Sequence, residues 1–398
     1  MKILKSALKL FAATKFFMKS KQEFFRKKLN IRRGGRRLKK PPAAPPSGVK
    51  VVDTLNKKNL FGLTLDELTA ELAPLPKFRA KQIAQKIYKH GVKNFDEMTD
   101  LPKNLRAELS TRYEIKIAEL LTRLDSRDGL TTKFLLGFDG AAVEVVLMRH
   151  DYGNSVCISS QVGCQMGCKF CASTLKGLER NLTAAEMLAE IFFVEMFLRG
   201  ENQKLDSVVI MGTGEPLMNF DALIKMLRLL HEDYCLGMSY RKITISTCGV
   251  VPAIKKLRDE KIPVTLSISL HAPDENLRSE IMPINSAFNM KTLLAAGDDY
   301  AQSTGRRVTY EYILLGGVND TEEHARRLAK ILSGQLANVN LIPFNPVDER
   351  SFRPPTKTAV QKFFHFLNTH GIGATIRKEM GADVNAACGQ LRAKFDGR

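Results

Sequence analysis

Residues 156–171 read VCISSQVGCQMGCKFC, a short β-rich run that leads into three closely spaced cysteines. Cys164, Cys168 and Cys171 have the spacing CxxxCxxC. Thiolates at this spacing can bind three irons of a cubane 4Fe-4S cluster and leave the remaining iron without a protein ligand. Clusters that only carry electrons, and structural zinc sites, normally take four protein ligands. The stretch therefore predicts one cluster per chain, with an open iron that binds a substrate.

A zinc site is the alternative interpretation of these cysteines, with His150 or His271 as the fourth ligand. Zinc sites of this kind usually pair their cysteines as two C-x(2–4)-C units, which this stretch lacks. Seven cysteines spread over 398 residues also do not form the disulfide framework of a small secreted protein. We therefore favour an iron–sulfur cluster, which requires a reducing compartment.

Runs typical of β-strands recur from this point onward and alternate with helical patterns. They cover residues 156–159, 208–211, 243–247, 264–270, 308–314 and 339–344. Strands that alternate with helices form parallel sheets in α/β proteins. Six such units predict a partial (β/α)6 TIM-like barrel within residues 155–392. Thr183 and Glu186 have the spacing of a capping box and mark the first intervening helix.

The segment before the barrel has two other patterns. Residues 51–118 predict a small helical domain, which begins with a capping box at Thr64 and Glu67 and continues with apolar residues at helical spacing. Residues 119–154 then predict a β-hairpin linker, because strand-like runs at 132–138 and 142–148 are joined by Asp139 and Gly140. No apolar stretch is long enough to span a bilayer.

The first fifty residues differ from the rest in charge. They contain sixteen Lys or Arg and one acidic residue, Glu23, so they carry +15 of the net +19. With the proline-rich run at 41–46, this composition predicts a disordered basic arm rather than a folded core. Such an arm can neutralise RNA phosphates. The alternatives are a solubilising tail, an upstream start codon or an organelle-targeting segment.

Small and polar residues follow the predicted strands. In parallel α/β folds the ligand lies at the carboxyl ends of the strands, so these residues are expected to form one binding site. Glycines such as Gly214 allow close backbone approach, and Glu215 offers a carboxylate to an ammonium group. Taken singly, each residue is more often a turn or capping residue. The candidate set is Gly214, Glu215, Ser246, Ser269, Leu270, His271 and Asn345.

Four further cysteines lie outside the cluster motif. A lone cysteine is usually a small buried hydrophobic residue, and we expect this of Cys235 and Cys248. Cys157 lies inside a predicted strand, seven positions before Cys164. Cys388 lies in a polar, glycine-containing segment near the C-terminus, where we expect an exposed thiol that can act as a nucleophile.

Together these motifs resemble the bacterial dual-specificity ribosomal and transfer RNA adenine C2 methyltransferases, which are radical S-adenosylmethionine (SAM) enzymes. The resemblance covers about residues 59–392 and leaves the basic arm outside it. It rests on the 157–171 stretch and on segments of the same order along the chain, GEPLMN at 214–219, SLHAP at 269–273, GVND at 317–320, PFNP at 343–346 and ACGQ at 387–390.

This resemblance implies roles for three side chains. Cys388 would take a methyl group from one SAM and become S-methylcysteine, and a second SAM would yield the radical that activates this methyl for addition to C2. Glu144 would accept the C2 proton, and Cys157 would release the product by forming a transient disulfide with Cys388. From its strand alone, Glu144 would be interpreted as a surface carboxylate on an edge strand.

The resemblance also implies the partners. The RNA targets would be 23S ribosomal RNA at the peptidyl transferase centre and the adenosine 3′ of the anticodon in tRNA, and the reductant a flavodoxin-like protein. We expect a monomer in the cytoplasm, with an organelle as the second choice. Two alternatives for the function are methylation of adenosine C8 in 23S ribosomal RNA and a nonenzymatic metal-stabilised RNA-binding protein.

Overall fold

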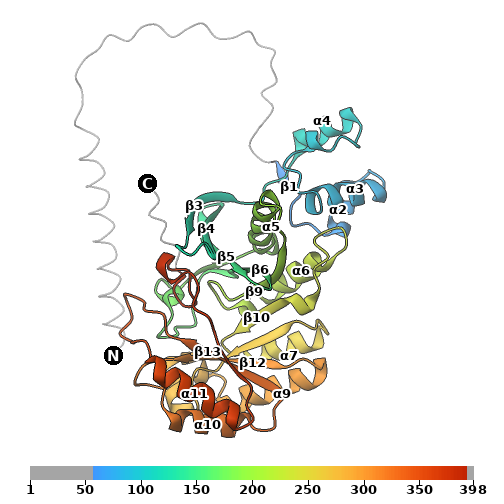
Figure 1. Ribbon diagram of the computed structural model, residues 1–398. Coiled ribbons are helices and arrows are strands. Elements are labelled where there is room, and N and C mark those ends of the chain that lie inside the picture. The colour runs from blue at the N-terminus through green and yellow to red at the C-terminus, as the bar shows by residue number, and fades with distance from the viewer. Residues whose placement is uncertain (1–56, 392–398) are drawn as a thin grey trace, which may run out of the picture. The chain divides into compact units, whose positions relative to one another are not determined.

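The computed structural model describes residues 57–391, so the predicted basic arm at 1–50 lies outside the described residues. Its centre is a ten-stranded sheet with the order β14-β13-β12-β11-β10-β9-β6-β5-β4-β3 (Figure 1). Neighbouring strands from β6 to β14 are all parallel. These parallel strands are β6 (Gly153–Ile158), β9 (Leu205–Ile210), β10 (Ile243–Thr247), β11 (Thr265–Ser269), β12 (Val308–Leu314), β13 (Ala337–Pro343) and β14 (Ala374–Ile376).

Helices connect the parallel strands and confirm the predicted α/β architecture. Figure 1 shows α5, α6, α7 and α9 side by side along one flank of the strands. The helices of this part are α5 (Ala184–Gly200), α6 (Phe220–His231), α7 (Val251–Asp259), α8 (Glu275–Ile281), α9 (Met290–Thr304), α10 (Glu322–Leu332) and α11 (Lys357–Thr369). The capping box of Thr183 and Glu186 begins α5 as predicted. Strand β14 was not predicted, because three residues are too few to show a strand period.

The strands before β6 continue the same sheet. β3 (Glu119–Asp125), β4 (Thr131–Phe138) and β5 (Ala141–His150) are antiparallel, and β5 pairs with β6. The predicted hairpin is present, because Phe138 pairs with Ala141 across Asp139 and Gly140. The segment 119–154, expected as a β-hairpin linker to the core, is joined to the barrel sheet by backbone hydrogen bonds. Strand β5 is therefore an interior strand.

A helical segment precedes β3. It contains α2 (Leu65–Glu71), α3 (Lys77–Tyr88) and α4 (Lys103–Arg112), and its short strands β1 (Lys58–Asn59) and β2 (Tyr113–Glu114) pair with each other. The capping box of Thr64 and Glu67 begins α2. The Tyr88 ring of α3 lies 5.9 Å from the Phe192 ring of α5, so this segment packs on the first barrel helix. Within residues 57–391, no helix is long and apolar enough to cross a membrane.

Candidate active site

The three cluster cysteines lie in a loop whose ends are held together by a small hairpin. Strands β7 (Gln161–Gly163) and β8 (Leu178–Asn181) pair antiparallel and enclose residues 164–177. Gly163 has φ +76°, and a Cβ there would collide with the carbonyl oxygen of Gly177. The same carbonyl accepts the Cys164 N–H at 2.9 Å. Only glycine fits at position 163, and it sets the direction in which the cysteine loop leaves the hairpin.

The cysteine loop borders a cavity of about 130 Å³, which we call the cofactor cavity. Most of the residues predicted from the strand ends line it, although they come from separate strands. The predicted residues on its wall are Cys164, Cys168, Cys171, Gly214, Glu215, Ser246, Ser269 and His271. Two predicted residues are absent from this wall. Leu270 is fully buried in the hydrophobic core, and Asn345 lines a different cavity.

Gly214 and Glu215 hold the loop after β9 against the cysteine hairpin. Gly214 has φ +107°, and a Cβ there would lie 2.6 Å from Cβ of Gln161. The Glu215 carboxylate accepts backbone N–H groups of Cys248 at 2.7 Å and Leu217 at 3.0 Å. Burial raises the pKa of Glu215, and the Cys248 hydrogen bond opposes this shift. Glu215 therefore positions the loop after β10, and the residue also lines the cofactor cavity.

His271 lines the cofactor cavity and has one ring nitrogen bound to the backbone. Its Nδ1 accepts the N–H of Ile313 at 3.0 Å, which places the proton of the neutral ring on Nε2. Burial lowers the pKa of His271 to about 3, so the ring stays neutral at physiological pH. A neutral ring with Nε2–H is a hydrogen-bond donor, suited to an acceptor on a nucleoside.

Two residues near this cavity were not predicted as site residues. Cys248 is buried as expected, but it lines the cofactor cavity together with the three cluster cysteines. Arg278 is fully buried in α8, and its guanidinium donates to the carbonyls of Cys248 (2.8 Å) and Ser269 (3.2 Å). It therefore ties together the loops after β10 and β11. No local motif could have indicated this, because both partners are set by tertiary packing.

The residues of the cofactor cavity fit a 4Fe-4S cluster with bound SAM. Three thiols from one loop face a cavity walled by glycine backbone, hydroxyl groups and an imidazole donor. Burial raises the pKa of Cys164 to about 11, so iron must displace its proton to bind the thiolate. Within residues 57–391, no three His, Cys, Asp or Glu side chains converge on a single metal ion. A cubane accommodates this, because each cysteine binds a different iron.

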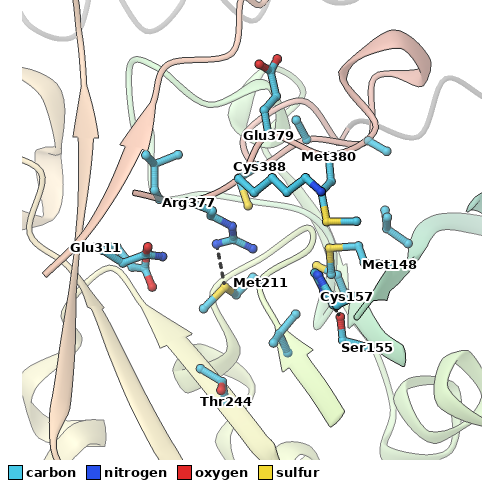
Figure 2. A pocket seen from close by; sticks show the side chains of 18 of the residues that line it. Met148, Ser155, Cys157, Met211, Thr244, Glu311, Arg377, Glu379, Met380 and Cys388 are labelled. Carbon is cyan, nitrogen blue, oxygen red and sulfur yellow. Dashed lines mark hydrogen bonds between the residues drawn. The ribbon is translucent and has the colours of Figure 1, made fainter. Parts of the chain in front are cut away.

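A larger cavity of about 520 Å³ lies inside the barrel, and we call it the cysteine cavity. Cys157 of β6 and Cys388 of the C-terminal loop both line it, and Figure 2 shows them reaching into the same space. Met211 borders both this cavity and the cofactor cavity, so the two are neighbours. Burial raises the pKa of Cys157 to about 12. Both Cys157 and Cys388 are free thiols in this structure.

The loop that carries Cys388 is tied to the cluster loop. The N–H of Ala172 donates to the carbonyl of Gly389 at 2.8 Å, and the Ser173 hydroxyl donates to the carbonyl of Leu391 at 2.8 Å. The expectation of an exposed thiol is wrong, because Cys388 is half-buried. Residues that are more than 200 positions apart in the sequence are therefore held side by side.

Arg377, at the end of β14, was also not predicted. Its Nη1 lies 3.5 Å from the sulfur of Met211, and Figure 2 shows its guanidinium beside Cys388. Negative charge on Cys388 raises the pKa of Arg377, Glu311 and Cys157 add to this effect, and burial opposes it. Arg377 thus places a fixed positive charge in the cysteine cavity.

Glu144 is buried, in contrast to the surface carboxylate that its strand alone indicated. It lies on interior strand β5, and its Oε1 is 2.9 Å from Nζ of Lys133 on β4. The same Nζ donates to the carbonyl of Asn385 at 3.2 Å, three residues before Cys388. Glu144 does not border the cysteine cavity, but Val146 and Met148 on the same strand do. Lys133 therefore links the carboxylate to the loop that carries Cys388.

Comparisons with known proteins agree with this geometry. Residues 158–329 match the radical SAM superfamily, and residues 58–115 match the ribosomal RNA large subunit methyltransferase N-terminal domain. A probable dual-specificity RNA methyltransferase RlmN from Symbiobacterium thermophilum is 48% identical over 342 residues, which cover 85% of this chain and 92% of the relative. The chain belongs to the RlmN family of radical SAM RNA methyltransferases.

Other members of the RlmN family have similar coverage. The probable dual-specificity RNA methyltransferase RlmN of Staphylococcus aureus is 45% identical over 348 residues, which are 87% of this chain and 95% of the relative. The crystal structure of a radical SAM methyltransferase from Sphaerobacter thermophilus has a TM-score of 0.82 at 42% identity. It covers 85% of this chain and 100% of the compared chain.

Membership in the RlmN family confirms the predicted class of enzyme and its cofactors. The chain is a radical SAM RNA methyltransferase that uses SAM and a 4Fe-4S cluster. This result contradicts the zinc interpretation of the cysteine loop and the alternative of a nonenzymatic RNA-binding protein. His150, one of the two candidate zinc ligands, borders the cysteine cavity and not the cofactor cavity.

Proposed function

We propose that this enzyme methylates C2 of adenosine in 23S ribosomal RNA and in tRNA, with an S-methylcysteine at Cys388 as intermediate. One observation carries the proposal: Cys157 and Cys388 line one cavity, which adjoins the cavity of the three cluster cysteines. A simple radical SAM site needs only the three cluster ligands. Two further thiols beside it support a mechanism in which the protein itself carries the methyl carbon.

The ring carbon at C2 has no lone pair with which to attack a methyl sulfonium, so a radical route is required. When bound, the cluster and SAM supply a methyl group and a 5′-deoxyadenosyl radical. The Cys388 thiolate would attack this methyl carbon, so that a new S–CH3 bond forms on Cys388, the sulfonium S–CH3 bond breaks and S-adenosylhomocysteine leaves. Transfer of one hydrogen atom from that methyl to the 5′-deoxyadenosyl radical would give 5′-deoxyadenosine and leave a carbon radical on Cys388. This radical adds to C2 and joins the RNA covalently to Cys388.

The remaining steps use Cys157 and Glu144. The adduct gives up one electron to a one-electron acceptor, and the Glu144 carboxylate takes the proton from C2. Because Glu144 does not border the cysteine cavity in this structure, this step requires that the Cys388 loop, to which Lys133 links Glu144, shifts when RNA binds. The Cys157 thiolate then attacks the sulfur of Cys388, which forms a disulfide and breaks the bond between that sulfur and the transferred carbon. That carbon takes up a proton and becomes the methyl group, and an external dithiol returns the disulfide to two thiols.

The substrate choice follows from the chemistry and from the names of the relatives. Because C2 lies inside a stacked base, the adenosine must be unstacked and presented to the cavity, which suits single-stranded RNA loops. Relatives of high identity are named dual-specificity RNA methyltransferases. We assign to this enzyme 23S ribosomal RNA at the peptidyl transferase centre and tRNA at the adenosine 3′ of the anticodon. The proposal includes a cytoplasmic monomer, reduced by a flavodoxin-like donor, whose segment 51–118 helps to bind RNA.

The position of the methyl group tests this proposal. RNA from cells with and without the gene is digested to nucleosides, and the methyladenosine isomers are separated and identified by mass spectrometry. We expect 2-methyladenosine in both ribosomal RNA and tRNA only when the gene is present. Detection of 8-methyladenosine would instead support the C8 activity.

A further inference from the structure

Tyr152 is an unusually exposed aromatic residue at the edge of the cysteine cavity. It lies in the turn between β5 and β6, and 82% of its surface is accessible. A ring left this open in water contributes nothing to the hydrophobic core. We propose that Tyr152, backed by His150, is a stacking platform for an unpaired base of the RNA substrate next to the target adenosine. This inference rests on the proposed function, because it requires that RNA enters the cysteine cavity.

The His150 and Tyr152 rings are stacked, and a hydrogen bond to Ser155 holds His150 in place. Their centroids are 4.6 Å apart and the ring planes differ by 6°. The His150 Nε2 lies 3.1 Å from the hydroxyl of Ser155, a buried residue on β6. His150 therefore covers one face of Tyr152 and fixes its orientation. The other face can accept a flat partner without loss of an existing contact, which is the geometry of base–aromatic stacking.

The platform borders the cavity that contains the two proposed reaction thiols. Tyr152, His150 and Ser155 line the same cavity as Cys157 and Cys388. A base that stacks on Tyr152 therefore borders the same cavity that the flipped adenosine must enter. Flipping one nucleotide leaves its neighbours partly unstacked, and an aromatic surface can replace the lost stacking.

Charged residues of both signs border the cysteine cavity, and the basic ones near the platform can contact RNA phosphates. Arg377 and Lys378 lie close enough to His150 to lower its pKa, although burial is the larger cause. The imidazole is thus neutral at physiological pH, and the stack presents an aromatic face rather than a cation. Lys378 is exposed and borders the same cavity, so its ammonium is available to an RNA phosphate.

Binding of RNA to Tyr152 variants tests the platform. The reconstituted holoenzyme is titrated with an unmodified tRNA anticodon stem-loop carrying a fluorescent label. We expect Tyr152→Ala to raise the Kd about 5- to 150-fold, the range for loss of one base–aromatic stack. Tyr152→Phe and Tyr152→Trp should retain wild-type affinity, because stacking needs the ring and not the hydroxyl. Leu336→Ala is the matched control, since Leu336 is exposed and, like Tyr152, directly precedes a parallel strand, but it borders neither cavity.

An abasic nucleotide at each position flanking the target locates the contact. At one position, the abasic RNA should bind wild type and Tyr152→Ala equally, because the stacking partner is already missing. Unchanged affinity of Tyr152→Ala for intact RNA would overturn the platform, as would a loss of affinity that persists at every abasic position. Methyl incorporation into Cys388 without RNA, measured by mass spectrometry in the same preparations, tests the proposed function separately. If Cys388 of the wild-type enzyme takes up no methyl group in this measurement, the proposed mechanism is refuted independently of the result for Tyr152.

Discussion

The cysteines beside the two cavities differ in surroundings, and these differences match their proposed tasks. Cys164, Cys168 and Cys171 share one loop and one cavity wall, as ligands of a single cluster must. Cys157 is held on an interior strand, whereas Cys388 is half-buried on a loop. A thiol that carries a methyl group between two substrates suits a loop. A thiol that attacks only once suits a rigid strand.

Substitution of Cys157 and substitution of Cys388 should stop the reaction at two different stages. We expect Cys157→Ala to accumulate a covalent RNA–protein adduct, because the Cys388 sulfur can no longer be attacked. Cys388→Ala should form no adduct. Denaturing gel electrophoresis with labelled RNA measures both. Cys235→Ala, a buried cysteine that borders neither cavity, is the control and should behave as wild type. No adduct in Cys157→Ala would contradict the assigned roles.

The raised pKa of Cys157 predicts how this thiol reacts in the resting enzyme. Burial moves its pKa from 9.0 to about 12, so the thiolate is a small fraction at neutral pH. The rate of Cys157 alkylation by iodoacetamide should rise about tenfold per pH unit from pH 7 to pH 10, because the thiolate fraction does. Peptide mass spectrometry follows the modification. A rate that levels off near pH 9 would show that Cys157 keeps the ordinary thiol pKa.

At the level of elements, the site depends on loops that are packed against one another. The loop after β9 needs Gly214, since a Cβ there would lie 2.6 Å from Gln161 Cβ and 2.8 Å from Ser160 Oγ. We expect Gly214→Ala to lower SAM affinity at least tenfold, because both the collision and the positive φ displace Glu215. Equilibrium dialysis with the holoenzyme measures this. Gly237→Ala is the control, since it has φ +59° but no atom within 4 Å.

The pairing of strands β4 and β5 positions Glu144 through Lys133. The side chains of Lys133 and Glu144 are only 10% and 9% exposed. Lys133→Met removes the cation from this buried pair and should lower the free energy of unfolding by about 3 kcal/mol. Urea unfolding of the full chain measures the loss. Lys204→Met is the control, because Lys204 pairs with Asp206 and its side chain is 79% exposed. This substitution should change the free energy of unfolding by less than about 1 kcal/mol. Equal effects of the two substitutions would exclude a positioning role for Lys133.

At the level of the whole molecule, the basic arm adds charge to an otherwise weakly basic chain. The first fifty residues carry +15 of the net +19. Their deletion should weaken RNA binding and reduce the slope of log Kd against log salt, since each phosphate contact contributes about 0.7 to that slope for single-stranded RNA. Titrations over a series of KCl concentrations measure both quantities. An unchanged slope would show that the arm does not bind RNA.

Short-range patterns were sufficient for most of the fold. The capping boxes at Thr64 and Thr183, the turn at Asp139 and Gly140 and the six strand runs each depend on residues close together in the chain. The strand β14 escaped prediction because of its length. The interior position of β5 in the sheet was also not predicted. The order of strands depends on which sheet edge is free for pairing, and the residues of one strand do not encode this.

By itself, the sequence of this protein determined the chemistry of the individual groups: three thiols at cluster spacing, glycines where the backbone must turn and polar residues after strands. Only the tertiary structure decided which groups meet. It brought Cys157 and Cys388 into one cavity, paired Lys133 with Glu144, placed Arg377 beside Cys388 and stacked Tyr152 on His150. The physical reason is the range of the forces involved. Hydrogen bonds, caps and backbone sterics act between near neighbours, whereas contacts across hundreds of residues exist only after the sheet and its helices have packed.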